Sequence, residues 1–219
     1  MNKKPSFASW LLSILLLLAC VAAVAKESSG TVVSLRGDTL ERLKKNAWHT
    51  MVQGDKVSMG ERLRTGRTAV AVIEFPGVGR FVMGPDSEIE MGREPKDFTT
   101  KMNRGALWMQ TALPVGNRAA ISTPIAIAGV RGTAFSMVFG EGDKAICACT
   151  CTGNIEVTSP DGRKLTVPKG EYVAIDAGRS VPTKAQPSAP VLEQSGTVFD
   201  FCQACHVLGG KGKLKPEWK

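Results

Sequence analysis

The residues best suited to chemistry lie near the end of the chain, where two thiols and an imidazole stand together. Cys202, Cys205 and His206 form a Cys-x-x-Cys-His motif. This spacing is typical of c-type haem attachment, because the two thiols form thioether bonds to the vinyl groups while the imidazole ligates the iron. The sequence therefore predicts that Cys202, Cys205 and His206 can hold haem c.

The segment around this motif is short for a haem protein. Only 13 residues follow His206, too few for a cytochrome fold, so a haem would have to rest on another part of the chain or on another molecule. Met51, Met59, Met109 and His49 are candidates for the second iron ligand, and the sequence does not choose among them. Two other interpretations stay open: a simple disulfide or dithiol with His206 incidental, and a cytochrome remnant that binds nothing.

A second group of thiols lies in the middle of the chain. Cys147, Cys149 and Cys151 occupy alternate positions, so in a β-strand all three sulfurs would lie on one face. Residues two apart on a strand are about 6.6 Å apart, at the limit for a disulfide, so pairing needs a thiol from elsewhere. Cys202 and Cys205 are candidates, because the chain between them and this row is long enough to return to it.

Three uses of this row remain open. The cysteines could pack as small apolar side chains or form a disulfide, and they could serve a redox function. They could also form a metal site, in which Cys147, Cys149 and Cys151 bind zinc or copper together with His206. Their spacing along one strand differs from that of a usual zinc knuckle.

The first 25 residues are typical of an export signal. A basic start precedes an apolar stretch over residues 10–24, and residues 23–25 (Ala-Val-Ala) offer a small-x-small cleavage site. We therefore predict a signal peptide over residues 1–25 and a periplasmic protein. The alternative is a lipoprotein signal, in which Cys20 becomes a lipid-anchored first residue and the protein associates peripherally with the membrane.

Export also changes how the charge is interpreted. A net charge of +8 would suggest nucleic acid in the cytoplasm, but an exported chain meets envelope components or anionic small ligands, so we predict no nucleic-acid partner. The densest basic stretch of the body combines Arg62, Arg64 and Arg67 with Lys44 and Lys45. We interpret it as solvated charge along a strand edge rather than as an anion site.

The elements that must position these groups are short β-strands. Residues 69–75 alternate apolar and polar side chains, residues 76–79 supply a Pro-Gly turn, and residues 80–83 return as a partner strand. The same pattern recurs at residues 88–91, 105–109, 134–139, 154–157 and 172–175.

The strands are short and half-apolar, so the stable arrangement is two sheets face to face or one sheet rolled on itself. We predict an all-β domain of antiparallel strands over residues 26–179, built as a two-sheet roll or sandwich. Pro and Ser are frequent in residues 180–195, which predicts a linker. Residues 196–219 then form a disordered or lightly structured tail that carries the Cys-x-x-Cys-His motif.

The order and spacing of several turn motifs in the body carry a family resemblance. The motifs are Gly54-Asp55, Gly60-Glu61, Arg64-Thr65-Gly66 before a long strand, and Thr123-Pro124 leading to Val130-Arg131-Gly132-Thr133. Together they resemble the FecR domain, the periplasmic sensor module of the iron-citrate signalling family, over residues 30–178. The resemblance implies an all-β periplasmic domain that binds a ligand or partner and is not an enzyme.

The chain departs from the members of this family that restrain a sigma factor. Those members place a cytoplasmic helical segment and a membrane span before the β domain, whereas here a cleavable leader stands at the start. We therefore expect a stand-alone exported form of the domain.

Three functional classes follow from these observations. We predict a non-enzymatic binding or sensing module whose partner is an unknown periplasmic protein or cell-envelope component. The alternative is a redox or sensor protein that carries haem c, and the third class is a thiol or metal protein. Catalytic residues are not predicted, because the chain has only two His and no acid, base and nucleophile come together.

Overall fold

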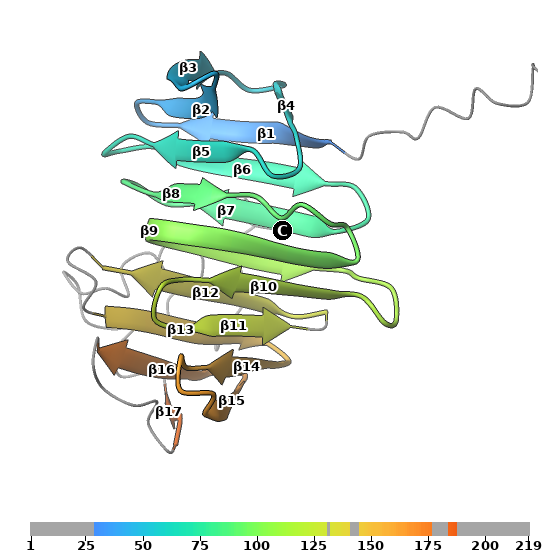
Figure 1. Cartoon of the computed structure of the whole chain (residues 1–219), viewed down its shortest axis with the longest axis vertical. Coiled ribbons are helices and arrows are strands. Elements are labelled where there is room, and N and C mark those ends of the chain that lie inside the picture. Colours follow the sequence, from blue (N-terminus) through green and yellow to red (C-terminus); the bar gives the residue numbers. More distant parts are fainter. Residues whose placement is uncertain (1–28, 131, 141–144, 177–183, 188–219) are drawn as a thin grey trace, which may run out of the picture.

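The chain folds as a stack of β-strands. The computed structural model describes residues 29–130, 132–140, 145–176 and 184–187. Within these ranges every regular element is a strand, and the strands lie one above another along the long axis of the molecule (Figure 1). The predicted all-β fold is therefore confirmed. Among the described residues there is no helix long and apolar enough to cross a membrane.

The first sheet, sheet A, has antiparallel neighbours throughout its described strands. In spatial order these are β4 (Lys56–Val57), β1 (Gly30–Arg36), β6 (Val70–Phe75), β7 (Gly79–Met83), the second half of β9 (Asp97–Thr111), β12 (Ala134–Phe139), β13 (Ala145–Thr152), β16 (Glu171–Asp176) and β17 (Gln186–Pro187).

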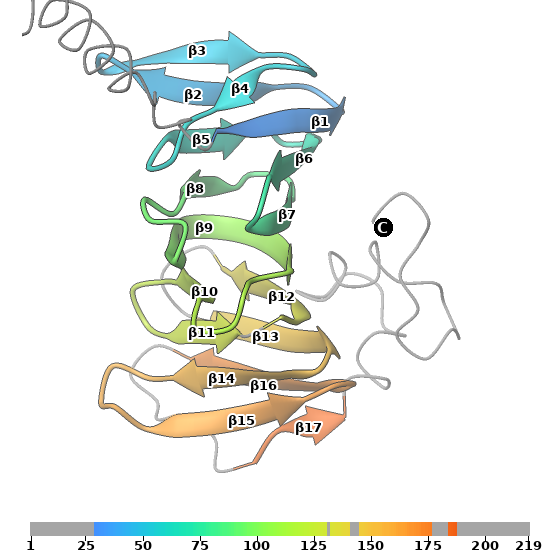
Figure 2. The ribbon, with the colours of Figure 1, turned by 90° about the vertical axis from the view of Figure 1, so that its right-hand side faces the viewer.

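The second sheet, sheet B, faces sheet A across a shared core (Figure 2). Its described strands are, in spatial order, β3 (Ala47–Met51), β2 (Leu40–Lys44), β5 (Arg62–Thr65), β8 (Glu88–Glu90), the first half of β9, β10 (Arg118–Ser122), β11 (Ile127–Val130), β14 (Asn154–Thr158) and β15 (Lys164–Pro168). We call the face of each sheet that points away from the other its outer face.

Strand β9 joins the two sheets. Its first half pairs with β8 and β10 in sheet B, and its second half pairs with β7 and β12 in sheet A. The strand passes from one sheet to the other at Gly105, whose φ is +94°. A Cβ at this position would lie 2.3 Å from the Oγ and 2.4 Å from the Cα of Ser87. Glycine is therefore required both by the left-handed backbone and by the close approach of the neighbouring corner.

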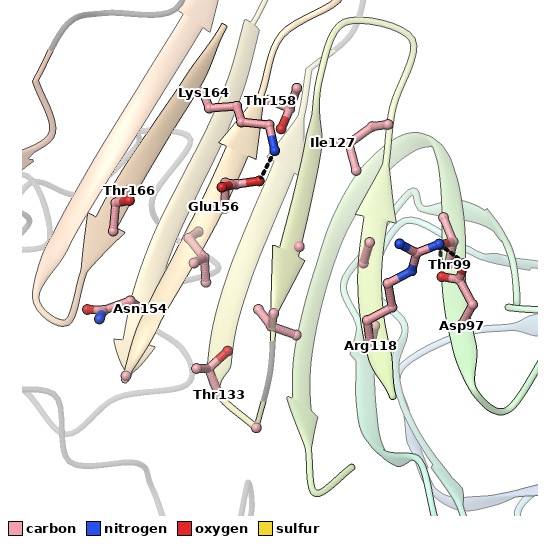
Figure 3. Close-up of a pocket in the computed structure, with 17 residues that line it drawn as sticks. Asp97, Thr99, Arg118, Ile127, Thr133, Asn154, Glu156, Thr158, Lys164 and Thr166 are labelled. Atoms are coloured by element: carbon pink, nitrogen blue, oxygen red, sulfur yellow. Dashed lines mark hydrogen bonds and ion pairs between the residues drawn. The ribbon is translucent and has the colours of Figure 1, made fainter. Parts of the chain in front are cut away.

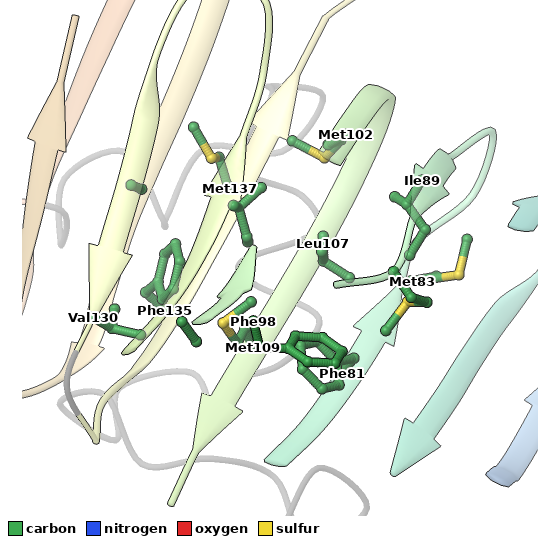
Figure 4. Close-up of a cluster of buried hydrophobic side chains, with 14 of the residues drawn as sticks. Phe81, Met83, Ile89, Phe98, Met102, Leu107, Met109, Val130, Phe135 and Met137 are labelled. Atoms are coloured by element: carbon green, nitrogen blue, oxygen red, sulfur yellow. The ribbon is translucent and has the colours of Figure 1, made fainter. Parts of the chain in front are cut away.

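The core lies between the sheets and is filled from alternate positions of both (Figure 4). In β6 the side chains of Ile73 and Phe75 are buried while that of Glu74 is exposed, as the alternation predicted. The rings of Phe75, Phe81 and Phe98 meet with centroids 5.1–5.9 Å apart, so they tie β6 and β7 of sheet A to β9 in sheet B. Burial of these rings provides much of the hydrophobic stabilisation that holds the sheets together.

One pairing differs from the antiparallel pattern. The chain leaves β9 at the end that belongs to sheet A and returns to sheet B through residues 112–117. Strand β10 then lies beside the first half of β9 and runs parallel to it, from Arg118 opposite Asp97 to Ser122 opposite Lys101. The alternation of side chains cannot reveal this direction, because it is the same in parallel and antiparallel strands.

The basic stretch lies in the interior of sheet B, so the predicted strand edge is wrong for Arg62 and Arg64. Both belong to β5, which is flanked by β2 and β8. The Nε of Arg64 donates to Glu41 at 2.6 Å, and its guanidinium lies 4.3 Å from the ring centroid of Trp48. Arg62 forms an ion pair with Glu88. Carboxylates on the neighbouring strands, opposite Arg64 at Glu41 and diagonal to Arg62 at Glu88, balance the charge, which makes an edge position unnecessary.

A short strand lies within the predicted linker. The residues of β17 pair with β16, with Gln186 opposite Tyr172 and Pro187 opposite Glu171. The preceding Ala185 is buried and belongs to the main core. The described chain therefore ends against the edge of sheet A that lies farthest from β4.

Candidate functional site

The outer face of sheet B is hollowed into a groove of about 940 Å³. The groove crosses five neighbouring strands, β9, β10, β11, β14 and β15, and Figure 3 shows the side chains that line it. These strands extend from the middle of the stack towards the end that carries the C-terminal strands (Figure 1). The described strands that line it run roughly side by side, so the groove lies across the strands rather than along one of them. A depression of this size is typical of a ligand site.

Small side chains create the floor of the groove. One cross-strand row runs through Thr99, Ala120, Gly129, Glu156 and Thr166. At Gly129 an added Cβ would meet nothing closer than the carbonyl oxygen of Glu156, at 4.0 Å. The sheet is therefore open at its centre because β10 and β11 present Ala and Gly there.

Two ion pairs flank this floor, on opposite sides of β11 (Figure 3). The Nη2 of Arg118 donates to Oδ2 of Asp97 at 2.5 Å, and the Nζ of Lys164 donates to Oε1 of Glu156 at 2.8 Å. All four side chains are at least 42% exposed. Exposed pairs of this kind contribute little to stability, so their charged groups can exchange partners with a ligand at small cost.

The charge state of the first pair is fixed at neutral pH. The hydrogen bond from Arg118 lowers the pKa of Asp97 below its ordinary value, against a smaller opposing effect of burial. The same bond raises the pKa of Arg118. Both groups therefore stay ionised, and this side of the groove offers one cation and one anion to a bound molecule.

The remaining lining combines hydroxyl and amide groups with one apolar side chain. Thr158, Thr166 and Asn154 supply hydrogen-bonding groups, and Ile127 is 46% exposed at the centre of the groove wall. Such a lining can hydrogen-bond and ion-pair with a polar ligand while covering part of an apolar one. The described lining thus supplies binding chemistry.

Among the groove residues, the sequence pointed to Val130, Gly132 and Thr133 as part of a family motif and to residues 154–157 as a strand, but not to Gly129, Asp97 or Arg118 as parts of a site. Gly129, Asp97 and Arg118 are ordinary strand residues when taken one at a time. A signal for Gly129 did exist, because the alternating stretch at residues 125–129 predicts a strand and places a glycine within it. The pairing of Asp97 with Arg118 depends on the parallel contact between β9 and β10, which had no signal in the sequence.

The predicted haem site is not part of the described structure. Cys202, Cys205 and His206 lie outside the described residues. Among the proposed second iron ligands, Met51 and Met109 are buried in the core between the sheets, and His49 is exposed on β3. The haem prediction therefore stays a prediction.

The predicted row of cysteines lies on β13, as the alternation suggested. Cys149 is 3% and Cys151 2% exposed, and both belong to the outer face of sheet A. The side chain of Cys147 lies outside the described part. Among the described residues no group of three or more His, Cys, Asp and Glu could hold a metal ion. The metal site at Cys147, Cys149 and Cys151 is thus untested.

Comparison with known proteins supports the family resemblance for part of the chain. The family model described as FecR protein matches residues 61–156. This stretch begins just before β5, ends within β14, and includes Gly129 and both members of the Asp97–Arg118 pair. No curated protein matches the chain.

Two solved structures share the fold. Both are crystal structures of a protein described as a proposed anti-sigma factor from Parabacteroides distasonis ATCC 8503, at 2.50 and 1.65 Å resolution. Each is similar over 62% of this chain, with a TM-score of 0.53 and 14% sequence identity. The matched part covers 64% and 65% of those chains, less than two thirds of their length. At this identity the similarity concerns the fold alone.

Proposed function

We propose that this chain is an exported sensing or regulatory module of the FecR type, which binds a ligand or a partner segment in the groove of sheet B and catalyses no reaction. The observation that carries the proposal is the open floor at Gly129. A glycine in the middle of a strand lowers the stability of the strand and has no side chain to pack. A binding groove, which needs an open floor, explains why glycine occupies this position. The FecR match over this stretch supports a regulatory role.

The lining defines the class of ligand. Cationic and anionic groups lie on both sides of the floor, and threonine hydroxyls are part of the lining. We infer that the ligand carries charges of both signs and several hydrogen-bonding groups, as an extended segment of an envelope protein does. Because the ion pairs are exposed, binding should weaken as the salt concentration rises.

Site-specific photocrosslinking in cells tests this proposal. A benzoylphenylalanine at Thr166, an exposed residue of the groove, should give a discrete crosslinked product. The same group at Thr50, an exposed residue of β3 in the same sheet but outside the groove, should not. Adding Gly129→Leu should reduce the Thr166 product about tenfold, because the new side chain fills the floor and removes roughly 1.4 kcal/mol of binding or more.

Two controls make the result decisive. Gly129→Leu should leave the thermal unfolding of the protein close to that of the wild type, since the backbone is not left-handed and the position is open. Thr50→Leu adds a side chain of the same size elsewhere on sheet B and should leave the crosslink unchanged. Equal crosslinking at Thr166 and Thr50, or crosslinking indifferent to Gly129→Leu, would contradict binding in the groove.

A second candidate function follows from the Cys-x-x-Cys-His motif. We propose haem c attachment at Cys202 and Cys205 with His206 as iron ligand, on the evidence of the sequence motif alone. Coexpression with the c-type maturation machinery should then give a red protein with a Soret band. Cys202→Ala should abolish the band, whereas Cys149→Ala should not.

Export and anchoring are part of the same proposal. The leader over residues 1–25 supports a periplasmic location, and Cys20 supports the lipid-anchored alternative. The intact mass of the mature protein separates the two. Cleavage after Ala25 gives an unmodified N-terminus at Lys26, whereas a lipoprotein begins at an acylated Cys20.

A further inference from the structure

The charged side chains of the groove follow a fixed order across the strands. Among the described residues of the lining, the charged ones are Asp97 on β9, Arg118 on β10, Glu156 on β14 and Lys164 on β15. Strand β11 lies between β10 and β14 and contributes Gly129 to the floor, with no charged side chain in the described lining. From β9 to β15 the order is therefore negative, positive, gap, negative, positive.

The strand register gives the spacing of these charges. The two members of each pair lie on adjacent strands, and two interstrand steps separate Arg118 from Glu156. With about 4.8 Å per step, the distance from β9 to β15 is roughly 19 Å, and Asp97 and Lys164 also lie four positions apart along the strands, or about 13 Å. The charges thus follow a diagonal of roughly 23 Å across the groove (Figure 3), which about seven residues of extended chain span.

This order has a direction. The sequence of negative and positive is repeated, not mirrored, from one end of the groove to the other. A ligand with the complementary order, which is positive, negative, gap, positive, negative, meets an opposite charge at every position in one orientation. When the same ligand is turned end for end, each of its charges meets a like charge, which disfavours binding.

Recognition in this groove must come from side chains. The three inner strands, β10, β11 and β14, are each paired on both sides with neighbouring strands. Their backbone groups are therefore engaged within the sheet, and a ligand that crosses them cannot add as a further strand. The four charged side chains are at least 42% exposed above the open floor, so their order is a source of specificity.

We propose that the groove selects an extended segment of an envelope protein by the order of its charges. The segment carries a basic and an acidic residue, a spacer, and a second basic and acidic residue within about seven positions. It binds in one direction, with its basic end at β9 and its acidic end at β15. This selection rests on the proposed function, because it requires a partner segment in the groove.

Exchanging the charges of one pair tests the selection. Asp97→Arg combined with Arg118→Asp keeps an ion pair but reverses the order at the β9 end. With benzoylphenylalanine at Thr166, this variant should give at least about tenfold less crosslinked product in cells, because two attractive contacts become repulsive. A tenfold loss corresponds to about 1.4 kcal/mol of binding.

A matched control comes from sheet A. Glu74→Arg combined with Arg80→Glu exchanges a cross-strand ion pair of the same kind outside the groove. This exchange should leave the amount of the Thr166 product unchanged. An equal loss of product in the control would show that the effect does not come from the order of charges in the groove, and would overturn the proposal.

A second exchange keeps the test independent of the first variant. Thermal unfolding shows whether the Asp97/Arg118 variant is folded. Glu156→Lys combined with Lys164→Glu reverses the order at the β15 end and should reduce a crosslink from benzoylphenylalanine at Thr99 by a similar factor. If Gly129→Leu reduces the wild-type product but both exchanges leave it unchanged, groove binding stands and the selection by charge order is wrong. If the wild type gives no product, both proposals fail.

The positions of the crosslinks test the direction. Thr99 lies at the β9 end of the groove and Thr166 at the β15 end. Tandem mass spectrometry of the two products should place the Thr99 crosslink beside a basic residue and the Thr166 crosslink beside an acidic residue of the same segment. The opposite arrangement, or crosslinks to two unrelated segments, would overturn the proposal.

Discussion

The two halves of β9 show how one strand can serve two different surfaces. Outward-pointing residues of the first half, Lys101 and Asn103, are exposed on sheet B. The outward-pointing Trp108 of the second half is 0% exposed on sheet A. Both halves alternate in the same way and both bury their inward side chains in the same core. The difference teaches that the outer face of sheet B meets water or a ligand along β9, whereas the outer face of sheet A carries a buried apolar cluster around Trp108.

The contrast concerns the centre of sheet A, because nearer its edge Glu74 and Arg80 also form an ion pair on the outer face. Sheet B carries cross-strand ion pairs on its outer face, such as Arg64 with Glu41 and Lys164 with Glu156. The central row of sheet A places Val82 and Cys149 at the corresponding outward positions. A substitution on one face should therefore have consequences that the same kind of substitution on the other face does not have.

The largest expected effect is the loss of the indole on sheet A. Trp108→Ala should lower the free energy of unfolding by about 3–5 kcal/mol, because it leaves a cavity at a fully buried position. Trp48→Ala on sheet B removes a partly exposed ring that contacts Arg64 and should cost less than about 1 kcal/mol. Urea denaturation followed by circular dichroism measures both. Equal losses of unfolding free energy in the two variants would contradict the proposed difference between the two outer faces.

The bend that separates the two halves gives the next largest effect. Gly105→Ala should cost about 2–4 kcal/mol, because it forces an L-residue into a left-handed conformation and against Ser87. Gly129→Ala, at the open floor of the groove, should be neutral or stabilise by up to about 1 kcal/mol. The same urea titration compares the two, and coinciding midpoints would show that the bend at Gly105 is not constrained.

One added hydroxyl group should lower the stability by different amounts on the two outer faces. Val82→Thr keeps the shape of the side chain but buries an added hydroxyl beside Trp108 on the outer face of sheet A, which should cost about 1–2 kcal/mol. Ile127→Thr places a hydroxyl on the outer face of sheet B, where the side chain is 46% exposed, and should stay within about 0.5 kcal/mol of the wild type. Thermal unfolding of both variants checks the difference, and a neutral Val82→Thr would show that water already reaches the outer face of sheet A at Val82.

Lowering the pH should reduce the free energy of unfolding through an ion pair of sheet B, by less than about 1 kcal/mol. Partial burial raises the pKa of Glu88, but hydrogen bonds from Arg62 and Asn103 outweigh it, so the pKa lies below its ordinary value of 4.5. A depressed pKa means that the ionised group stabilises the folded state above pH 4.5, and that this stability is lost as the pH falls through the folded pKa.

This dependence can be assigned to one residue. In Glu88→Gln the free energy of unfolding should change less between pH 5 and pH 3 than in the wild type, as measured by urea titrations at several pH values. Val82→Thr, which changes sheet A, should keep the wild-type slope. An unchanged slope in Glu88→Gln would show that the ion pair with Arg62 contributes nothing in this range.

The all-β fold could be predicted because its signals are local. Alternation at residues 69–75, a Pro-Gly turn and a returning strand specify a hairpin without reference to the rest of the chain. The two thiols described on β13, Cys149 and Cys151, were placed on one face by the same reasoning. The interior position of Arg62 and Arg64 was missed, because a charged strand in the middle of a sheet looks like an edge strand until its partners Glu88 and Glu41 are known.

The groove could not be predicted for a related reason. Its floor brings together Thr99, Ala120, Gly129, Glu156 and Thr166 from five strands. Each is unremarkable in its own strand, and only the register of the strands aligns them. The chemistry of a cysteine, by contrast, is visible in the sequence one residue at a time.

By itself the sequence determined that the body is made of brief strands with one buried side, since the two-residue period and the turn residues act over a few neighbouring positions. The tertiary structure alone decided that β10 runs parallel to β9 and that Ala120 and Gly129 lie side by side in the floor of the groove. It also decided that Trp108 points away from the core and is nevertheless buried. Strand order and register depend on contacts between residues far apart in the chain, and those contacts arise only when the two sheets pack together.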